Sequence, residues 1–411
     1  MSVSAVVHPG DALSRGERLT YIFVLGALTA LGPFTIDLYL PALPVLEKEL
    51  AAPTALVQLT LTATMVGFAL GQLFVGPLSD QVGRRRPLLF ATAVHILACL
   101  GAALAPDLLW LGIARVFQGV GAAAGGVVAM AMVRDLFGGY PLVKMLSRLA
   151  LVSGLAPVLA PVIGSQLLLV VDWRGLFVFL SVFGFLVLIA NAIFLRETLP
   201  AGARHVRGHS TVAQRYGALF RDRIYVGAVI IAGANFSALF AYLSSSSFLF
   251  QDVYALTPQQ YGLLFGINSI GVIVGVQSSS LLQKRIGPQW IVAGATIVQF
   301  LAAGSILVLN IAGAGFVGIV IPLWFFIAAC GFNFPAISAL ALVRHGHEAG
   351  TAASVLGAAN FGVAGIVSPI VGLFAITNAI PMAGVMLVAI AIAIVVLWTV
   401  VRPRTVPPLE A

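Results

Sequence analysis

Two charged side chains stand far inside long apolar stretches of this chain, Asp37 in the first stretch and Arg115 in a later one. An ionisable group in hydrocarbon costs on the order of 2.5–3.5 kcal/mol on insertion scales, so such groups are usually paired or functional. Burial disfavours the charged carboxylate and a nearby guanidinium favours it, and this balance suits a group that titrates near physiological pH. Proton exchange at Asp37 is the first chemistry that the sequence predicts.

The positions of the two residues within their stretches predict that they meet. Asp37 is about 5 residues, roughly 8 Å, from the outer end of its stretch, and Arg115 is about 7 residues, roughly 10 Å, from the outer end of its own. We therefore expect an Asp37–Arg115 pair at similar depth. The alternative is that Arg115 extends its guanidinium to the membrane surface without a partner.

Composition identifies the medium around these stretches. Hydrophobic residues make up 60% of the 411 residues and charged residues 9%, whereas a soluble domain carries about 25% charged residues. Cys99 and Cys330 both lie in apolar runs, so we expect neither a disulfide framework nor a metal site. Residues 1–19 lack the apolar core of a signal peptide. The chain is predicted to be a membrane protein with many spans.

Twelve apolar stretches are long enough to cross a bilayer as helices, which satisfy their own backbone hydrogen bonds. They do not alternate apolar and polar residues as barrel strands do. We expect an all-α polytopic fold with 12 transmembrane helices in two six-helix halves, residues 1–195 and 225–411, joined by a cytoplasmic linker at 196–224. The stretches cover residues 20–42, 57–78, 87–105, 108–131, 146–170, 173–195, 225–250, 260–282, 289–309, 315–343, 350–374 and 379–401.

The basic residues predict the orientation. If the N-terminus is cytoplasmic, only Lys48 and Arg174 of the 22 basic residues fall in outer loops, Arg115 lies within a span, and the other 19 face the cytoplasm. This asymmetry follows the positive-inside rule, so we expect a multi-pass protein of the cell (inner) membrane with both termini inside. The net charge of +8 marks that membrane face rather than nucleic-acid binding. We expect a monomer in the lipid bilayer.

The two halves resemble a diverged duplication. A shift of 204 residues lays Gly71 on Gly275 and Gly83 on Gly287, and parallel repeats are typical of transporters. The linker between them contains His205 and His209. These could bind a metal, but no acid or cysteine lies beside them, which favours a solvated loop.

The loop after the second stretch reads G-P-L-S-D-Q-V-G-R-R-R-P from Gly76 to Pro87. Gly76 and Gly83 permit a tight turn and close helix contact, and Asp80 and Arg84 could bridge neighbouring helices. A loop that merely carries positive charge is the plainer alternative. The string resembles the signature loop of the major facilitator superfamily, G-x-L-(S/A)-D-x-x-G-R-(K/R)-x, between spans 2 and 3 as that family requires. The resemblance implies that Asp80 and Arg84 belong to an inner gate that holds the halves together when the cavity opens outward.

Two further strings are similar to motifs of that superfamily. R-x-x-Q-G at Arg115, Gln118 and Gly119 resembles the fourth-helix motif implicated in proton transfer in proton-coupled members. Pro157 and Pro161, one turn apart, predict a kink in the fifth helix, and their surroundings are similar to the Gly/Pro motif of antiporting drug exporters. The string departs from the fullest form, G-P-x-x-G-G, and a kink that serves only packing is the alternative.

Asp37 lies in the run I-D-L-Y-L-P-A-L-P, from Ile36 to Pro44. This run resembles the first-helix signature of the Bcr/CflA drug-resistance branch, (T/S)-D-M-Y-L-P-A-(L/F)-P, whose members are proton-coupled exporters of antibiotics. The resemblance implies a proton:drug antiporter working by alternating access, with Asp37 as proton carrier and Arg115 as its coupling partner. Its partners would be protons and a small-molecule drug, and the proton gradient would take the place of any cofactor.

Polar side chains deep in the C-terminal stretches are neutral. Together with Tyr39 of the first stretch they are candidates for binding the substrate, although hydrogen bonding between helices is an ordinary role for such groups in membranes. For His95 we expect a packed neutral ring rather than a proton relay. The substrate-binding candidates are Tyr39, Asn235, Tyr242, Asn268, Trp324, Asn333 and Asn360.

A transporter of a small nutrient or metabolite on the same fold is the alternative function. Such proteins usually present more polar and charged groups in their cavity than this chain offers. A membrane enzyme or receptor would need a catalytic or metal-binding group within the spans, and a channel would need repeated filter elements. The sequence contains neither, so we expect a drug exporter that is not an enzyme.

Overall fold

The computed structural model describes residues 9–200, 202, 217, 219–342, 349–374 and 376–406. Long helices with short connections make up nearly all of these residues. Several helices begin where a side chain caps free backbone N–H groups, as Asp107 does before α5 and Asp172 before α7. The long helices in these ranges are α1 (Arg15–Asp37), α3 (Thr54–Val82), α4 (Arg85–Ala103), α5 (Leu108–Leu136), α6 (Gly139–Leu167), α7 (Trp173–Phe194), α9 (Arg223–Phe248), α10 (Pro258–Ile286), α11 (Pro288–Ile311), α12 (Gly315–Leu342), α13 (Ala349–Gly372) and α14 (Ile380–Val396).

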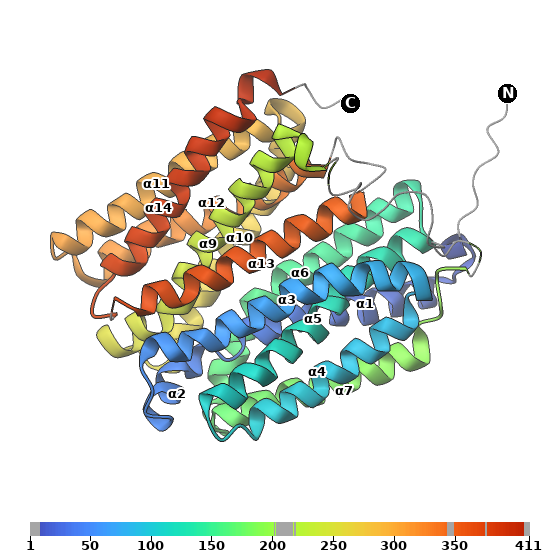
Figure 1. Cartoon of the computed structure of the whole chain (residues 1–411), viewed down its shortest axis with the longest axis horizontal. Coiled ribbons are helices and arrows are strands. Elements are labelled where there is room, and N and C mark those ends of the chain that lie inside the picture. Colours follow the sequence, from blue (N-terminus) through green and yellow to red (C-terminus); the bar gives the residue numbers. More distant parts are fainter. Residues whose placement is uncertain are drawn as a thin grey trace.

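The helices form two groups, α1 to α7 and α9 to α14. Figure 1 shows the blue-to-green helices on one side of the molecule and the yellow-green-to-red helices on the other. The two halves meet along two helix pairs, α3 with α13 and α6 with α10. We call the end that carries the short helix α2 (Leu43–Glu49) the α2 end, and the opposite end, where α3 and α4 meet, the Arg84 end.

The helices have the length and the surface of membrane spans. Among the described residues, eleven helices are long and apolar enough to cross a membrane, and α6 contains a shorter apolar run, Gly154–Leu167. Large apolar side chains such as Phe23, Phe74 and Phe90 lie largely exposed on the helix surfaces, which suits contact with lipid. The predicted all-α membrane fold is confirmed.

The glycines aligned by the repeat have matching roles in the two halves. A Cβ atom on Gly71 would lie 2.8 Å from a backbone oxygen of α5, and one on Gly275 would lie 2.3 Å from a backbone oxygen of α12. Glycine therefore lets α3 approach α5 and α10 approach α12. Gly83 (φ +101°) and Gly287 (φ +74°) end α3 and α10 with a backbone that L side chains rarely adopt. These matches support the predicted duplication.

Most of the predicted linker at 196–224, including His205 and His209, lies outside the described residues. On either side of it, α7 ends at Phe194 and α9 begins at Arg223. The exact boundaries of the halves at 195 and 225 stay predictions.

Candidate functional site

Asp37 is the last residue of α1 and is 6% exposed. Within the described part of the chain its carboxyl group has no hydrogen bond and enters no ion pair. It interacts electrostatically with the hydroxyl groups of Tyr242 on α9 and Tyr261 on α10. Both tyrosines belong to the C-terminal half, and Leu40, three residues after Asp37, accepts a hydrogen bond from Ser247 of that half. Asp37 therefore lies close along the chain to a contact between the halves, and its carboxyl group has no partner among the described residues.

Arg115 lies on α5 and is fully buried. Its Nη1 donates to the carbonyl oxygen of Thr35 (2.8 Å) and to Oε1 of Gln118 (2.6 Å), and its guanidinium carbon lies 4.1 Å from the centre of the Tyr39 ring. Thr35 is in the last turn of α1, where backbone carbonyls lack helical partners and a positive charge is favourable. Arg115 therefore stabilises the end of α1, two residues before Asp37.

The predicted Asp37–Arg115 ion pair is not formed in this structure, because neither residue takes part in any ion pair among the described residues. The physical reason is that the guanidinium of Arg115 is held by the Thr35 carbonyl oxygen and by Gln118, both inside its own half. Nε and Nη2 of Arg115 are buried and have no hydrogen-bond partner in the described ranges. The alternative in which Arg115 reaches the membrane surface is wrong, because the side chain is enclosed by protein.

A chain of hydrogen bonds continues from Arg115 to α4. Nε2 of Gln118 donates to Sγ of Cys99 (3.0 Å), that sulfur lies 3.5 Å from Nε2 of His95, and His95 Nδ1 lies 3.1 Å from the Gln118 carbonyl oxygen. A carbonyl oxygen can only accept, so Nδ1 must carry a proton, which leaves Nε2 to accept from the thiol in the neutral ring. Both ring nitrogens are satisfied without a charge, which supports the packed neutral histidine.

Side chains of the C-terminal half close the α2 end on the turn that follows α1. Oγ of Ser247 donates to the carbonyl oxygen of Leu40 (2.6 Å), and Nε2 of Gln251 donates to that of Pro41 (3.0 Å). The Leu40 oxygen also accepts from the Leu43 N–H. Pro44 has no N–H to donate to it, so its second lone pair accepts from Ser247 of the other half. We call these four bonded residues, Leu40, Pro41, Ser247 and Gln251, the α2-end closure.

Further contacts between the halves surround the α2-end closure. Nε2 of Gln58 on α3 donates to the Ser244 carbonyl oxygen of α9 (2.9 Å). At the rim, Nζ of Lys48 lies 2.9 Å from Oδ1 of Asp252. The halves are thus joined at this end by buried hydrogen bonds and one exposed ion pair, none of which involves Asp37.

The signature loop forms a cluster around Arg84. Nε of Arg84 donates to Asp135 (2.9 Å), and Nη1 donates to Ser79 (2.9 Å) and to Asp80. The backbone N–H of Arg84 donates to Glu197 (2.8 Å). Burial opposes the charge of Arg84, but the hydrogen bonds to Asp135 and Asp80 outweigh it and raise the pKa of the guanidinium above its ordinary value.

The Asp80–Arg84 bridge was predicted, but Asp135 and Glu197 were missed. Both acids follow an apolar stretch on the predicted inner side, where bases dominate, and this position was the signal that could have identified them. The bonded partners of the Arg84 side chain all belong to the N-terminal half, and Glu197, which accepts from its backbone N–H, lies at the start of the predicted linker. A gate that joins this cluster to the other half in another state stays a prediction.

The remaining motif residues bring helices close together. A Cβ on Gly119 would lie 2.3 Å from a backbone oxygen of α3, and one on Gly76 would lie 3.3 Å from a side chain of α5. Pro157 and Pro161 lie inside α6, which stays helical through both. A Cβ on Gly164, three residues later, would lie 1.9 Å from a backbone oxygen just after Asp37. The α6 motif therefore packs against the end of α1, and its role in antiport stays a prediction.

Three of the predicted substrate contacts bond to other helices of the C-terminal half. Nε2 of Gln299 on α11 donates to Oδ1 of Asn235 (2.8 Å), and Nδ2 of Asn333 donates to Oε1 of Gln299 (2.7 Å). Nδ2 of Asn268 donates to the Tyr242 hydroxyl (3.2 Å). Interhelical bonding, the ordinary role for such groups, is thus present for Asn235, Asn333 and Asn268, and substrate contact stays a prediction for all of them.

The other candidates are distributed over both halves. The Tyr39 hydroxyl lies 2.8 Å from Oγ1 of Thr60 inside the N-terminal half. Nε1 of Trp324 donates to the carbonyl oxygen of Ile267 (3.2 Å). Oδ1 of Asn360 on α13 is buried without a hydrogen-bond partner among the described residues. Tyr242 thus bonds to Asn268 within the C-terminal half, while Tyr39 packs on Arg115.

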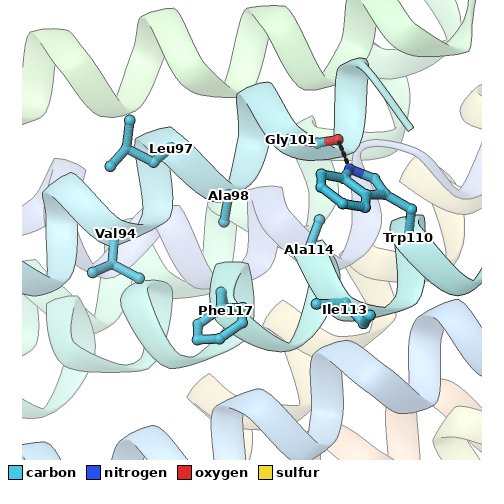
Figure 2. A pocket seen from close by; sticks show the side chains of 8 residues that line it. All are labelled: Val94, Leu97, Ala98, Gly101, Trp110, Ile113, Ala114 and Phe117. Carbon is cyan, nitrogen blue, oxygen red and sulfur yellow. Dashed lines mark hydrogen bonds between the residues drawn. The ribbon is translucent and has the colours of Figure 1, made fainter. Parts of the chain in front are cut away.

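An apolar groove of about 350 Å³ lies between α4 and α5. Figure 2 shows its lining side chains and the hydrogen bond from Trp110 to the Gly101 carbonyl oxygen (2.9 Å). Leu97, Ile113 and Phe117 are each at least half exposed, so the groove opens on the surface that suits lipid. None of the predicted site residues lines it. The lining residues are Val94, Leu97, Ala98, Gly101, Trp110, Ile113, Ala114 and Phe117.

Sequence comparisons identify the relatives of this chain. The Major Facilitator Superfamily profile matches residues 25–369. The "Uncharacterized MFS-type transporter YdgK" of Bacillus subtilis (strain 168) is 36% identical over 390 residues, 94% of this chain and 97% of its own. The "Bicyclomycin resistance protein homolog" of Haemophilus influenzae is 30% identical over 368 residues, 89% of this chain and 92% of its own. "Multidrug resistance protein MdtL" of Shewanella sp. (strain ANA-3) is 28% identical over 342 residues, 82% and 85% of the two chains.

Solved structures share the fold at 14% identity. The xylose transporter XylE from E. coli, in a partially occluded inward-open conformation, superposes with a TM-score of 0.76 over 96% of this chain and 99% of its own. A bacterial homolog of the human lysosomal transporter Spinster superposes with a TM-score of 0.73 over 96% and 100%. The chain therefore belongs to the Major Facilitator Superfamily of membrane transporters, in its drug-resistance branch.

Proposed function

We propose that this protein is a secondary active exporter that exchanges protons for a drug by alternating access, with Asp37 as the proton carrier and Arg115 as its coupling partner. Relatives named for bicyclomycin resistance and multidrug resistance support a drug as the substrate. The excess of basic residues in the predicted inner loops supports a place in the bacterial cytoplasmic membrane with both termini inside. The exporter works as a monomer, and the proton gradient drives it without a cofactor.

The observation that carries this proposal is the buried carboxyl group of Asp37, which has no partner among the described residues and lies three residues before the Leu40 carbonyl that bonds to the other half. A carboxylate in such a place is costly unless it is protonated or paired. Arg115, anchored two residues away at Thr35, keeps Nε and Nη2 without a hydrogen-bond partner in the described residues. These donors can receive the Asp37 carboxylate if the end of α1 turns during the cycle.

The α2-end closure supports a direction for the cycle. With Ser247 and Gln251 bonded across the halves, a drug would enter from the Arg84 end. Drug binding favours release of the proton from the Asp37 carboxyl group to that side, and the carboxylate then pairs with Arg115. After the halves rock, a proton from the other side returns to Asp37 and the drug leaves. Each ligand drives the change only because it binds the two states differently.

Inside-out membrane vesicles provide the test. Asp37→Asn keeps the size and polarity of the side chain but cannot carry a proton, so we expect drug accumulation to fall to the level seen with an uncoupler. The matched control is Asp107→Asn. Asparagine retains the N-cap of α5 that Asp107 provides, so accumulation should be unchanged. Full proton-driven accumulation by Asp37→Asn would exclude Asp37 as the carrier.

Whole cells provide the test of the alternative, a nutrient transporter. A panel of amphenicols, sulfonamides, quinolones and cationic dyes is applied to a pump-deficient host that expresses the chain. We expect resistance to at least one class, lost in Asp37→Asn. No change in susceptibility to any class would favour a nutrient or metabolite as the substrate.

A further inference from the structure

Three Asn-Phe dipeptides occur in the chain, and all lie in the C-terminal half, at Asn235-Phe236, Asn333-Phe334 and Asn360-Phe361. They belong to three different helices, α9, α12 and α13. Helical spacing within one element cannot bring them together, so any convergence is a property of the tertiary structure.

The three phenylalanines do converge. The Phe236 ring centre lies 5.2 Å from that of Phe361 and 6.0 Å from that of Phe334, in edge-to-face arrangements. Phe68 of α3, in the N-terminal half, stacks on Phe361 at 4.9 Å. Phe236, Phe334 and Phe361 are only partly buried, whereas Phe68 is 4% exposed. We call these four residues the aromatic cluster.

The asparagines beside these rings retain unused hydrogen-bonding atoms. Asn235 and Asn333 are bonded to each other (3.2 Å) and to Gln299, which holds α9, α11 and α12 together. Nδ2 of Asn235 and Oδ1 of Asn333 and Asn360 are nevertheless buried with no partner in the described residues. A buried amide group without a partner is destabilising, so these three atoms are places where a ligand's hydrogen bonds would be favourable.

The aromatic cluster also reaches the helix of the proton carrier. A Cβ atom on Gly32 of α1 would lie 3.4 Å from the Phe68 ring, and Gly32 precedes Asp37 by less than two turns. Phe68 thus lies between α1 and the Phe361 ring of α13. A ligand that moves Phe361 acts through Phe68 on the helix that ends at Asp37.

The charge of this region favours one class of ligand. The amide groups of Asn235, Gln299 and Asn333 are neutral, and among the described residues no cation–π contact involves the aromatic cluster. A desolvated cation needs a counter-charge, and the rings of the aromatic cluster and the amide groups beside them carry none. Phenylalanine is also a weaker cation–π partner than tryptophan.

We propose that the aromatic cluster and the amide atoms of Asn235, Asn333 and Asn360 form the binding surface for an uncharged, planar aromatic substrate. The ring of the substrate stacks among Phe236, Phe334 and Phe361, and its polar groups bond to the unused amide atoms. This assignment rests on the proposed export function and gives that function its substrate class. The rival surface is the apolar groove between α4 and α5, which offers Phe117 and Trp110 (Figure 2) but no unpartnered amide.

The test measures the KM of export in reconstituted vesicles for chloramphenicol, an uncharged drug with a planar ring, and for the cation ethidium. Phe361→Leu keeps an apolar side chain and removes the ring. Because an aromatic pair contributes about 0.5–1.5 kcal/mol beyond its buried area, we expect the chloramphenicol KM to rise about 2- to 10-fold. Phe117→Leu is the matched control in the groove, and its KM should equal that of the wild type.

Phe361→Tyr, which keeps the ring, provides a second variant that should retain the wild-type KM. The assignment is overturned if Phe361→Leu leaves the chloramphenicol KM unchanged, if Phe117→Leu raises it instead, or if ethidium is exported and chloramphenicol is not. Failure of the proton mechanism gives a different result, since Asp37→Asn would then export with full gradient dependence while Phe361→Leu still raised the KM.

Discussion

Each half of the molecule joins two of its helices through one glutamine and one cysteine. In the N-terminal half Gln118 of α5 donates to Cys99 of α4 at 3.0 Å, and in the C-terminal half Gln299 of α11 donates to Cys330 of α12, also at 3.0 Å. The difference lies in what the glutamine bonds next. Gln118 leads to Arg115, whereas Gln299 leads to neutral asparagines.

This comparison assigns different chemistry to halves that share one helical plan. Buried ionisable groups, Asp37, His95 and Arg115, are found in the N-terminal half, and the aligned position of His95 under the 204-residue shift is the neutral Gln299. A buried charge costs more than a buried amide that is hydrogen-bonded. A charge is therefore expected where protons are exchanged, and neutral amides suffice where an uncharged substrate is held.

Substitution of Arg115 should cause the largest loss of drug transport. Arg115→Gln removes the charge and the bond to the Thr35 carbonyl, so we expect drug accumulation in vesicles to fall to the uncoupled level. The C-terminal counterpart is Gln299→Leu, which removes only neutral bonds and should retain measurable, gradient-dependent export. Equal losses in both variants would contradict the division of roles between the halves.

Arg84 tests the difference between the halves at the Arg84 end. Charged hydrogen bonds contribute roughly 1.5–3 kcal/mol, so Arg84→Gln should lower the free energy of unfolding of the solubilised protein by about that amount. The control is Arg285→Gln. Arg285 is exposed in the last turn of α10, just before the equivalent turn of the other half, so the change should stay within about 0.5 kcal/mol. A similar loss in both variants would show that the cluster around Arg84 has no special role.

The stability that Arg84→Gln loses should depend on pH in a way that the pKa of Arg84 determines. Because folding raises the pKa of Arg84, its contribution to stability is fully present below the ordinary arginine pKa and is lost only as pH rises through the raised value. The stability difference between wild type and Arg84→Gln should therefore be the same at about pH 6 and about pH 8. A difference that decreased between these two values would indicate that another group titrates with the cluster.

Substitution of the two cysteines tests whether the glutamine–cysteine bond matters more for export in the N-terminal half than in the C-terminal half. Cys99→Ala leaves Nε2 of both His95 and Gln118 without a partner and loosens the chain that holds Arg115, so we expect the export rate to fall about 5- to 10-fold, equivalent to about 1–1.4 kcal/mol. Cys99→Ser retains a donor and an acceptor and should restore the rate. Cys330→Ala loses the same kind of bond in the other half and should leave the rate within about twofold. If Cys330→Ala exported as slowly as Cys99→Ala, the two halves would not differ in the role of this bond.

The smallest expected effect concerns the α2-end closure. Ser247→Ala removes one bond between the halves, worth about 0.5–1.5 kcal/mol, so hydrogen exchange of the Leu40–Glu49 backbone should become about 2- to 10-fold faster. Ser245→Ala is the matched control, because Oγ of Ser245 bonds within α9 to Ala241. Unchanged exchange in Ser247→Ala would mean that other contacts keep this end closed.

Much of the fold could be predicted because membrane helices are local structures. The twelve apolar stretches became the twelve long helices of the described chain, and the glycines at 83 and 287 ended α3 and α10 as the repeat implied. The family motifs and the burial of Arg115 could also be predicted. The partner of Arg115 could not, because a residue number gives depth along a helix but not the direction in which the side chain points.

The sequence by itself determined that Asp37 and Arg115 are ionisable groups within the spans of a twelve-helix transporter, since membrane spans follow from apolar length. Their similar depth stays a prediction. Only the tertiary structure decided that Arg115 bonds to Thr35 and not to Asp37, and that the phenylalanines of three separate Asn-Phe dipeptides meet. These contacts join residues tens to hundreds of positions apart. They depend on how the helices rotate and cross, which the periodicity of a single helix does not specify.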